Sequence, residues 1–122
     1  MSVAAKYQKV QVATCSPAQL VVMLYDGIIR FATEAVNAME RKDRARAGDR
    51  IGRAHAILEE LLATLDPSQS PELCENLSGL YAFCMHRLLT ANLEQNREAI
   101  AEVIALVRPL REAFAEIAAK AA

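Results

Sequence analysis

The chain has few of the residues on which small enzymes and secreted domains commonly depend. Its 122 residues include no Trp, only 5% aromatic residues, and four each of Gly and Pro. It contains no glycine-rich phosphate loop, no Cys-x-x-Cys pair and no nucleophile elbow. We therefore predict that the protein is not an enzyme and that it uses no metal and no cofactor.

The three cysteines do not predict a disulfide framework. Cys74 and Cys84 lie on one predicted helix at a separation of about 15 Å, whereas a disulfide needs Cα atoms within about 7 Å. Free thiols favour a reducing compartment. Residues 1–16 hold no apolar signal-peptide region, and no apolar run is long enough to cross a bilayer. We expect a cytoplasmic protein without membrane insertion.

The charge balance gives no reason to expect a nucleic-acid partner. The chain contains fourteen Lys and Arg and fifteen Asp and Glu, which gives a formal net charge of −1. A nucleic-acid surface would need a basic stripe, because the release of counterions from phosphates supplies most of that affinity. The densest basic run, residues 41–46, is interrupted by Asp43 and falls in a predicted connection. We interpret it as a solvated turn.

The apolar residues, 53% of the chain, recur at helical spacing in four segments. Ser-Pro pairs start the first and third segments, and Asp43 and Asn96 cap the second and fourth. Connections of about two to five residues require consecutive helices to run antiparallel. We therefore predict an all-α, up-down-up-down four-helix bundle over residues 16–122 that follows a flexible N-terminal arm, residues 1–15. The last helix is expected to kink or split at Pro109.

The first helix carries more apolar residues than one core-facing stripe needs. Every residue from Leu20 to Tyr25 is apolar, whereas a bundle helix needs about three positions in seven. One stripe is expected to face the core, namely Leu20, Leu24, Ile28, Phe31 and Ala35. A second stripe is expected to face elsewhere, namely Val22, Tyr25, Ile29 and Val36. The third helix has a similar excess at Tyr81, Phe83, Met85 and Leu89.

Two explanations of this surplus stay open. The arm, a kinked last helix or a weak homodimer could cover it. Alternatively, the surplus forms a groove for an amphipathic helix of a partner, and an arm could cover that groove until the partner displaces it. Gly27 leaves a similar choice between packing on a neighbouring bundle helix and close approach of a partner helix. Asp26 and Arg30 are spaced to form an i, i+4 ion pair.

Neither histidine lies in a pattern that predicts catalysis or metal binding. His55 and Glu59 form an i, i+4 pair, but there is no Glu-x-x-His motif, and His86 has no second ligand in its turn. Histidine phosphotransfer domains are also four-helix bundles with an exposed His. Here Leu58, Glu59 and Glu60 follow His55 in place of the usual Lys and Gly, and carboxylates would repel a phosphoryl group. A histidine phosphotransfer module is kept as an alternative only.

The start of the first helix forms a specific motif, and further matches to the same family follow it. The motif comprises Thr14-Cys15-Ser16-Pro17, Leu20, Met23-Leu24-Tyr25-Asp26-Gly27-Ile28 and Phe31. The further matches are Leu61, Leu65, Asp66, Asn76-Leu77, Leu80-Tyr81, Leu88, Ala91-Asn92 and Leu110-Arg111-Glu112-Ala113. Together they resemble the flagellar secretion chaperone FliS family over most of the chain. The chain departs from the family pattern at Cys15, usually Ala, at Phe114, usually Trp, and at Pro109.

The resemblance implies a cytosolic chaperone for the C-terminal segment of flagellin, the filament subunit. Such a chaperone prevents premature polymerisation and presents flagellin to the export gate of the flagellar type III secretion system. A chaperone for a different flagellar subunit is the alternative within this class. The resemblance assigns Tyr7 to partner or gate contacts. With the apolar surplus, it gives these partner-binding residues: Tyr7, Leu20, Val22, Met23, Tyr25, Asp26, Ile29, Leu77, Tyr81, Met85, Leu88 and Leu89.

Overall fold

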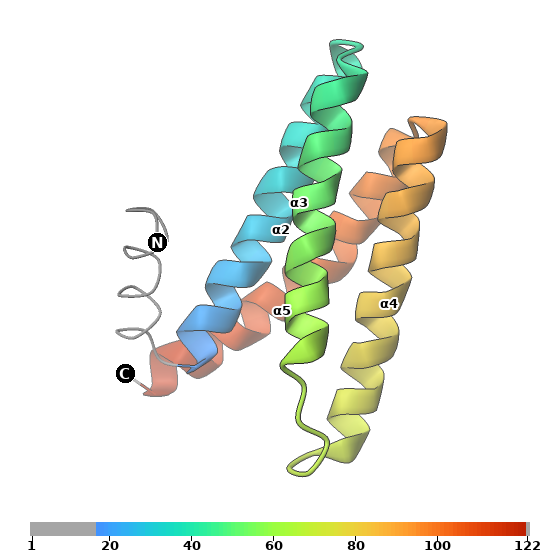
Figure 1. The fold of residues 1–122 in the computed structure, drawn as a ribbon. Helices are drawn as coiled ribbons and strands as arrows, with labels where there is room; N and C mark the ends of the chain where they lie inside the picture. The colour runs from blue at the N-terminus through green and yellow to red at the C-terminus, as the bar shows by residue number, and fades with distance from the viewer. Residues whose placement is uncertain (1–16, 122) are drawn as a thin grey trace, which may run out of the picture.

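The computed structural model describes residues 17–121, which form four helices joined by short connections (Figure 1). These are α2 (Pro17–Glu40), α3 (Arg44–Ala63), α4 (Pro71–Glu94) and α5 (Arg97–Ala121). No strand occurs within this range, and the predicted all-α four-helix bundle is confirmed. The predicted arm, residues 1–15, lies outside the described residues.

The helices begin and end at the residues that the capping rules select. Asp43 Oδ1 accepts a hydrogen bond from the backbone N–H of Arg46 at 3.1 Å, and Asn96 Oδ1 accepts two backbone N–H bonds in the first turn of α5. Both predicted caps are thus confirmed. Ser70 precedes α4 but makes no side-chain cap bond. Gln95 takes a left-handed φ of 52°, which ends α4 just before α5 begins.

Consecutive helices run antiparallel, and α5 closes the bundle by packing against both α4 and α2. Asp26 pairs with Arg111 of α5, so the expected pair between Asp26 and Arg30 is wrong. Gly27 has a structural explanation in α3, because a Cβ at this position would lie 2.9 Å from Ile57 Cδ1. Four ion pairs connect neighbouring helices: Arg50–Glu34, Arg97–Glu40, Arg111–Asp26 and Arg87–Glu102.

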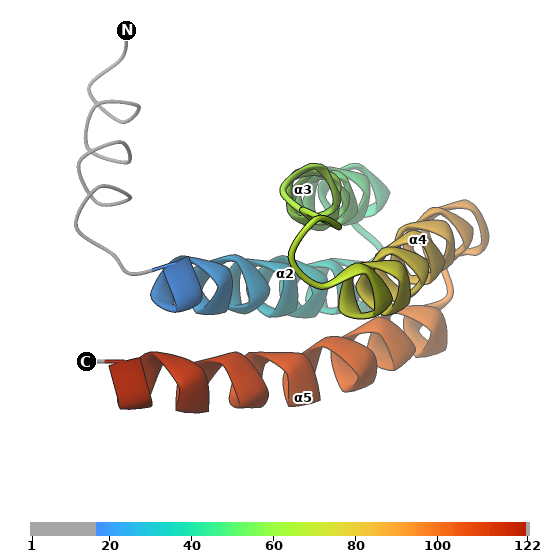
Figure 2. The same ribbon diagram turned by 90° about the horizontal axis from the view of Figure 1, so that it is seen from below.

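Pro109 lies inside α5 without dividing it. Because proline lacks an N–H, the carbonyl of Ala105 loses its usual helical hydrogen bond. The helix nevertheless continues to Ala121, and Figure 2 shows that its course bends between its first and second halves. Of the two expected outcomes, the split is therefore wrong, and α5 is one bent helix.

The buried residues differ in size between the two ends of the bundle. Near the α2–α3 and α4–α5 connections they are mostly small: Ala35, Ala38, Ala47, Ala91 and Ala99. Toward the other end they are larger: Tyr25, Ile28, Leu58, Leu61, Leu77 and Tyr81. The distance between packed helices depends on the side chains at their contact. At the alanine-rich end, which we call the closed end, α2 lies close to α3 and α4 lies close to α5, and the two helices of each pair diverge away from it (Figures 1 and 2).

Candidate partner-binding surfaces

The first half of α2 and the second half of α5 extend side by side beyond α3 and α4 (Figures 1 and 2). Residues seven apart lie on the same side of α5, but their exposure increases toward the C-terminal end of the helix. Val103 is fully buried, Leu110 is partly buried, and Ile117 is 52% exposed. Val107 and Phe114 repeat the change from buried to partly buried. With the partly buried start of α2, these side chains form what we call the splayed end: Leu20, Val21, Leu24, Leu110, Phe114 and Ile117.

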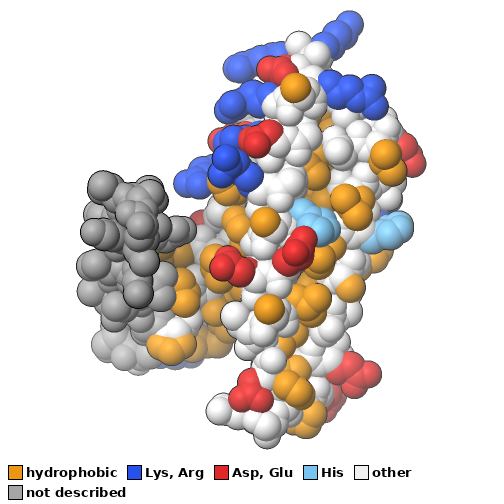
Figure 3. All heavy atoms as spheres, in the orientation of Figure 1, with side chains coloured by type: hydrophobic (Ala, Val, Ile, Leu, Met, Phe, Trp, Pro, Cys, Tyr) orange, Lys and Arg blue, Asp and Glu red, His pale blue; other side chains and the backbone are white. Residues whose placement is uncertain are grey.

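A second apolar surface lies along the outer side of α3 and α4, where Figure 3 shows hydrophobic side chains. A Cβ on Gly48 would lie 3.5 Å from the Asn92 side chain, which fixes the relative register of these antiparallel helices. One turn further along α3, nothing lies within 4 Å of the position that a Cβ on Gly52 would take. At that level of α4, Leu89 is 51% exposed, and Leu93, which follows Asn92 at the level of Gly48, is 78% exposed. We call this surface the α3/α4 face: Gly52, Ala56, Met85, Leu89 and Leu93.

A third feature is an open hollow of about 400 Å³ between α2 and α5. Its apolar lining is small, and the Glu40–Arg97 ion pair at 3.4 Å lies at its border. The lining residues are Thr33, Val36, Glu40, Arg97, Glu98, Ala101 and Ile104. The hollow is therefore a shallow, mainly apolar depression bordered by charged side chains, and it is not an enclosed ligand site.

Four of the predicted partner-binding residues lie in the core. Tyr25, Tyr81 and Leu88 are at most 2% exposed, and Leu77 is 8% exposed. The expectation that Tyr25 faces away from the core is wrong, because α3 and α5 both pack on α2 and widen its buried stripe. Tyr25 Oη and Tyr81 Oη lie 2.6 Å apart and share a hydrogen bond, so burial leaves neither hydroxyl unsatisfied. Burial raises the pKa of both phenols.

The other predicted residues divide between surfaces and half-buried positions. Met23, Asp26 and Leu89 are exposed, whereas Leu20, Val22, Ile29 and Met85 are partly buried. Tyr7 lies outside the described residues. Of the stripe expected to face the core, Ile28 and Ala35 are fully buried, whereas Leu20, Leu24 and Phe31 are only partly buried. The predicted residues thus do not form one groove, because some lie at the start of α2 and others on the α3/α4 face.

Sequence analysis missed the contribution of α5 and of one glycine. Leu110 and Ile117 continue the register of the buried Val103, and that register alone predicts burial for both. Within residues 17–121, α3 and α4 diverge from this part of α5 and leave it partly uncovered, and this splay of the bundle has no local sequence signal. Gly52, in contrast, carried a signal, since a mid-helix glycine is unfavourable unless something needs the space.

The described residues provide no catalytic arrangement. His55 Nδ1 lies 2.7 Å from Glu59 Oε1, and His86 is exposed. Between residues 17 and 121 there is no cluster of three or more His, Cys, Asp and Glu that could hold a metal ion. Cys74 and Cys84 are free, and burial raises the pKa of the Cys84 thiol to about 11, which keeps it protonated near neutral pH.

A helical bundle whose apolar stripes are left partly uncovered is the architecture of a protein that binds other proteins. Comparison with known families agrees with this class. Residues 1–121 match the family model described as flagellar protein FliS, and the chain belongs to the FliS family. That family consists of chaperones and not of enzymes, so the histidine phosphotransfer alternative receives no support.

Several curated relatives carry the name flagellar secretion chaperone FliS. The Campylobacter jejuni protein is 39% identical over 91% of this chain and 87% of its own length. The Salmonella typhimurium protein is 37% identical over 90% of this chain and 82% of its own length. The Bacillus subtilis protein is 32% identical over 88% and 80%, respectively. Among residues 17–121, no helix has the combination of length and apolar character that crossing a bilayer requires.

Proposed function

We propose that this chain is a cytosolic export chaperone that binds the C-terminal segment of flagellin. In this role it prevents premature polymerisation and aids export by the flagellar type III secretion system. Membership of the FliS family and the names of the curated relatives support the flagellar role. The uncovered apolar stripe of the splayed end is the observation that supports binding of a helical segment.

The physical basis of the proposal is coupled folding and binding. Filament subunits associate through apolar helical faces, so a free subunit needs a partner that covers these faces in the cytosol. Ordering a disordered segment costs about 2–5 kcal/mol or more, which burial of about 1,000–3,000 Å² offsets. The splayed end and the α3/α4 face lie on different parts of the bundle. A segment that uses both must therefore wrap around the molecule as more than one helix.

The predicted partner-binding residues take different parts in this proposal. Leu20, Val22 and Met23 would contact the client at the start of α2, and Met85 and Leu89 would do so on the α3/α4 face. A second group has a less direct role. Ile29, partly buried, and Asp26, paired with Arg111, are assigned to the edge between α2 and α5. Four buried residues shape the surfaces from beneath: Tyr25, Leu77, Tyr81 and Leu88. Tyr7 is assigned to partner or export-gate contacts on the family resemblance alone.

The test is titration of the full chain with a flagellin C-terminal peptide, followed by circular dichroism and by calorimetry at several temperatures. We expect a gain in helicity and a negative heat-capacity change, because the peptide folds and buries apolar surface. The absence of both signals at saturating peptide would refute the proposal. A pull-down that retains another flagellar subunit and not flagellin would favour the alternative client.

The matched variants are Ile117→Glu and Ala105→Glu, which place the same charge at two exposed positions of α5. Ile117 belongs to the splayed end, whereas Ala105 belongs to none of the surfaces defined above. We expect Ile117→Glu to weaken peptide binding about tenfold or more, since it puts a charge in an apolar contact. Ala105→Glu should bind like the wild type. Equal affinities of the two folded variants would remove the splayed end from the binding surface.

A further inference from the structure

Positive charge collects at the closed end of the bundle. Residues 30–53 contain seven Lys and Arg against four Asp and Glu, whereas residues 54–86 contain five Asp and Glu and no Lys or Arg. Figure 3 shows Lys and Arg gathered at the α2–α3 connection and acidic side chains further along the bundle. A chain with a net charge of −1 is therefore polarised along its axis. The basic run that the sequence assigned to a solvated turn is one part of a larger basic surface.

An aromatic ring organises part of this surface. The guanidinium carbons of Arg30, Arg50 and Arg53 lie 4.8, 5.3 and 5.9 Å from the centroid of the Phe31 ring. Arg30 and Phe31 belong to α2, and the other two belong to α3. The face of an aromatic ring attracts cations, and a planar guanidinium stacked on it keeps its donors directed outward. Arg30, which forms no ion pair within residues 17–121, is thus pre-arranged for the paired hydrogen bonds that carboxylates accept, whereas Arg50 and Arg53 already share Asp49.

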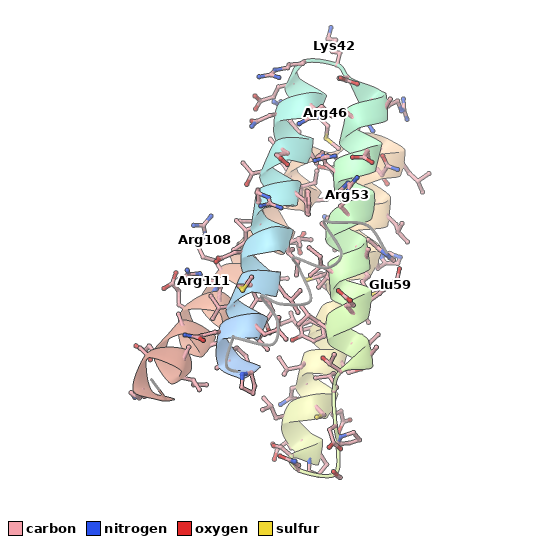
Figure 4. The ribbon with its side chains drawn as sticks, turned by 60° about the vertical axis from the view of Figure 1, so that its left-hand side comes forward. Lys42, Arg46, Arg53, Glu59, Arg108 and Arg111 are labelled. Carbon is pink, nitrogen blue, oxygen red and sulfur yellow. The ribbon has the colours of Figure 1, made fainter. Side chains whose placement is uncertain are left out.

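Internal carboxylates neutralise only some of these cations. Asp49 pairs with Arg50 and Arg53, Glu34 also pairs with Arg50, and the neighbouring Arg50 lowers the pKa of Asp49. The other five basic side chains of residues 30–53 form no ion pair with any residue in 17–121: Arg30, Arg41, Lys42, Arg44 and Arg46. Figure 4 shows Lys42, Arg46 and Arg53 spread from the α2–α3 connection along α3, with Glu59 further down the same helix. We call the following residues the basic end: Arg30, Arg41, Lys42, Arg46, Arg50 and Arg53.

We propose that the basic end docks an acidic, carboxylate-rich segment of a second protein. Charge complementarity selects this partner, and the Phe31 ring adds an apolar contact within the patch. The patch is short and the chain as a whole has a net charge of −1, so a short acidic protein segment fits better than a long nucleic-acid backbone, whose binding depends on an extended basic surface. The basic end lies at the closed end of the bundle, away from the splayed end. The acidic partner and an apolar client can therefore bind at the same time.

The test measures fluorescence anisotropy of a labelled peptide of about ten glutamates, which reaches about 33 Å when extended. We expect the full chain to bind it at low ionic strength and to lose affinity several-fold between about 50 and 200 mM salt. The double variant Lys42→Glu/Arg46→Glu should bind about tenfold more weakly or worse, because two attractions become repulsions. Both side chains are exposed, so the thermal unfolding measured by circular dichroism should stay unchanged.

The matched control is Arg108→Glu/Lys120→Glu, which changes the net charge equally at exposed positions of α5. We expect it to weaken peptide binding less than about threefold, since these positions lie outside the basic end. A loss of affinity as large as in the first variant would mean that net charge alone governs peptide binding, and it would overturn the proposal. Failure of the peptide to bind would do the same, as would tighter binding of an oligothymidine of equal length. Because no flagellin peptide is present, the outcome does not depend on the function proposed above.

Discussion

The closed end and the splayed end are built from the same four helices, yet they treat apolar residues differently. At the closed end small side chains such as Ala38, Ala47 and Ala99 let the helices approach, and the core is sealed. At the splayed end, within residues 17–121, Phe114 of α5 packs on Tyr25 but is only partly buried, and Ile117 is 52% exposed. Helical register decides which side of a helix is apolar. The packing of distant helices decides whether that side is covered.

The sharpest test compares one substitution at both ends of α5. Ile100→Ala at the closed end should lower the free energy of unfolding by about 2–5 kcal/mol, because it empties a fully buried site. Ile117→Ala, at a position 52% exposed, should lower it by less than about 1 kcal/mol, since water already reaches the side chain. Urea unfolding monitored by circular dichroism measures both. Similar losses at the two positions would mean that the splayed end is closed in solution.

The same contrast explains what sequence analysis could and could not predict. Helix starts and stops are local, so the caps at Asp43 and Asn96 and the antiparallel order were predicted correctly. The outward placement of Tyr25 was wrong, because two helices pack on α2 and a second tyrosine satisfies its hydroxyl. The exposure of Ile117 was missed for the opposite reason, since its spacing is that of a core residue. Both errors concern contacts between segments far apart in the chain.

A smaller effect on stability is expected at the Tyr25–Tyr81 pair. Tyr25 and Tyr81 join α2 to α4 by their hydrogen bond, and Tyr25 also packs on Phe114 with ring centroids 5.7 Å apart. Tyr25→Phe should lower the free energy of unfolding by about 1–3 kcal/mol, because the Tyr81 hydroxyl stays buried without its partner. Tyr25→Phe/Tyr81→Phe should recover much of this loss. If the single variant is as stable as the wild type, this bond does not help to limit the splay.

The tyrosine pair also makes a prediction about alkaline pH. Burial, followed by the hydrogen bond that the neutral Tyr25 hydroxyl shares with Tyr81, raises the pKa of Tyr25 above its unfolded value of about 10. The neutral phenol is thus favoured by folding, so its contribution is complete below pH of about 10 and is lost as the pH rises further. In the Tyr25→Phe variant the fall in stability above that pH should be less steep. Urea unfolding over a series of alkaline buffers checks the slope.

The smallest effect on stability concerns two glycines inside helices, Gly52 of α3 and Gly27 of α2. Gly52→Ala should raise the free energy of unfolding by about 1 kcal/mol, because alanine favours a helix and nothing lies within 4 Å of the new Cβ. Gly27→Ala is the matched control, since its Cβ would meet Ile57 Cδ1 at 2.9 Å and displacement of that side chain offsets the gain.

A flagellin helix that packs closely on the α3/α4 face needs the space at Gly52. The Gly52→Ala protein should therefore be more stable and yet bind the flagellin peptide more weakly. A gain in stability with unchanged affinity would exclude close helix packing at Gly52 and leave the splayed end as the main contact.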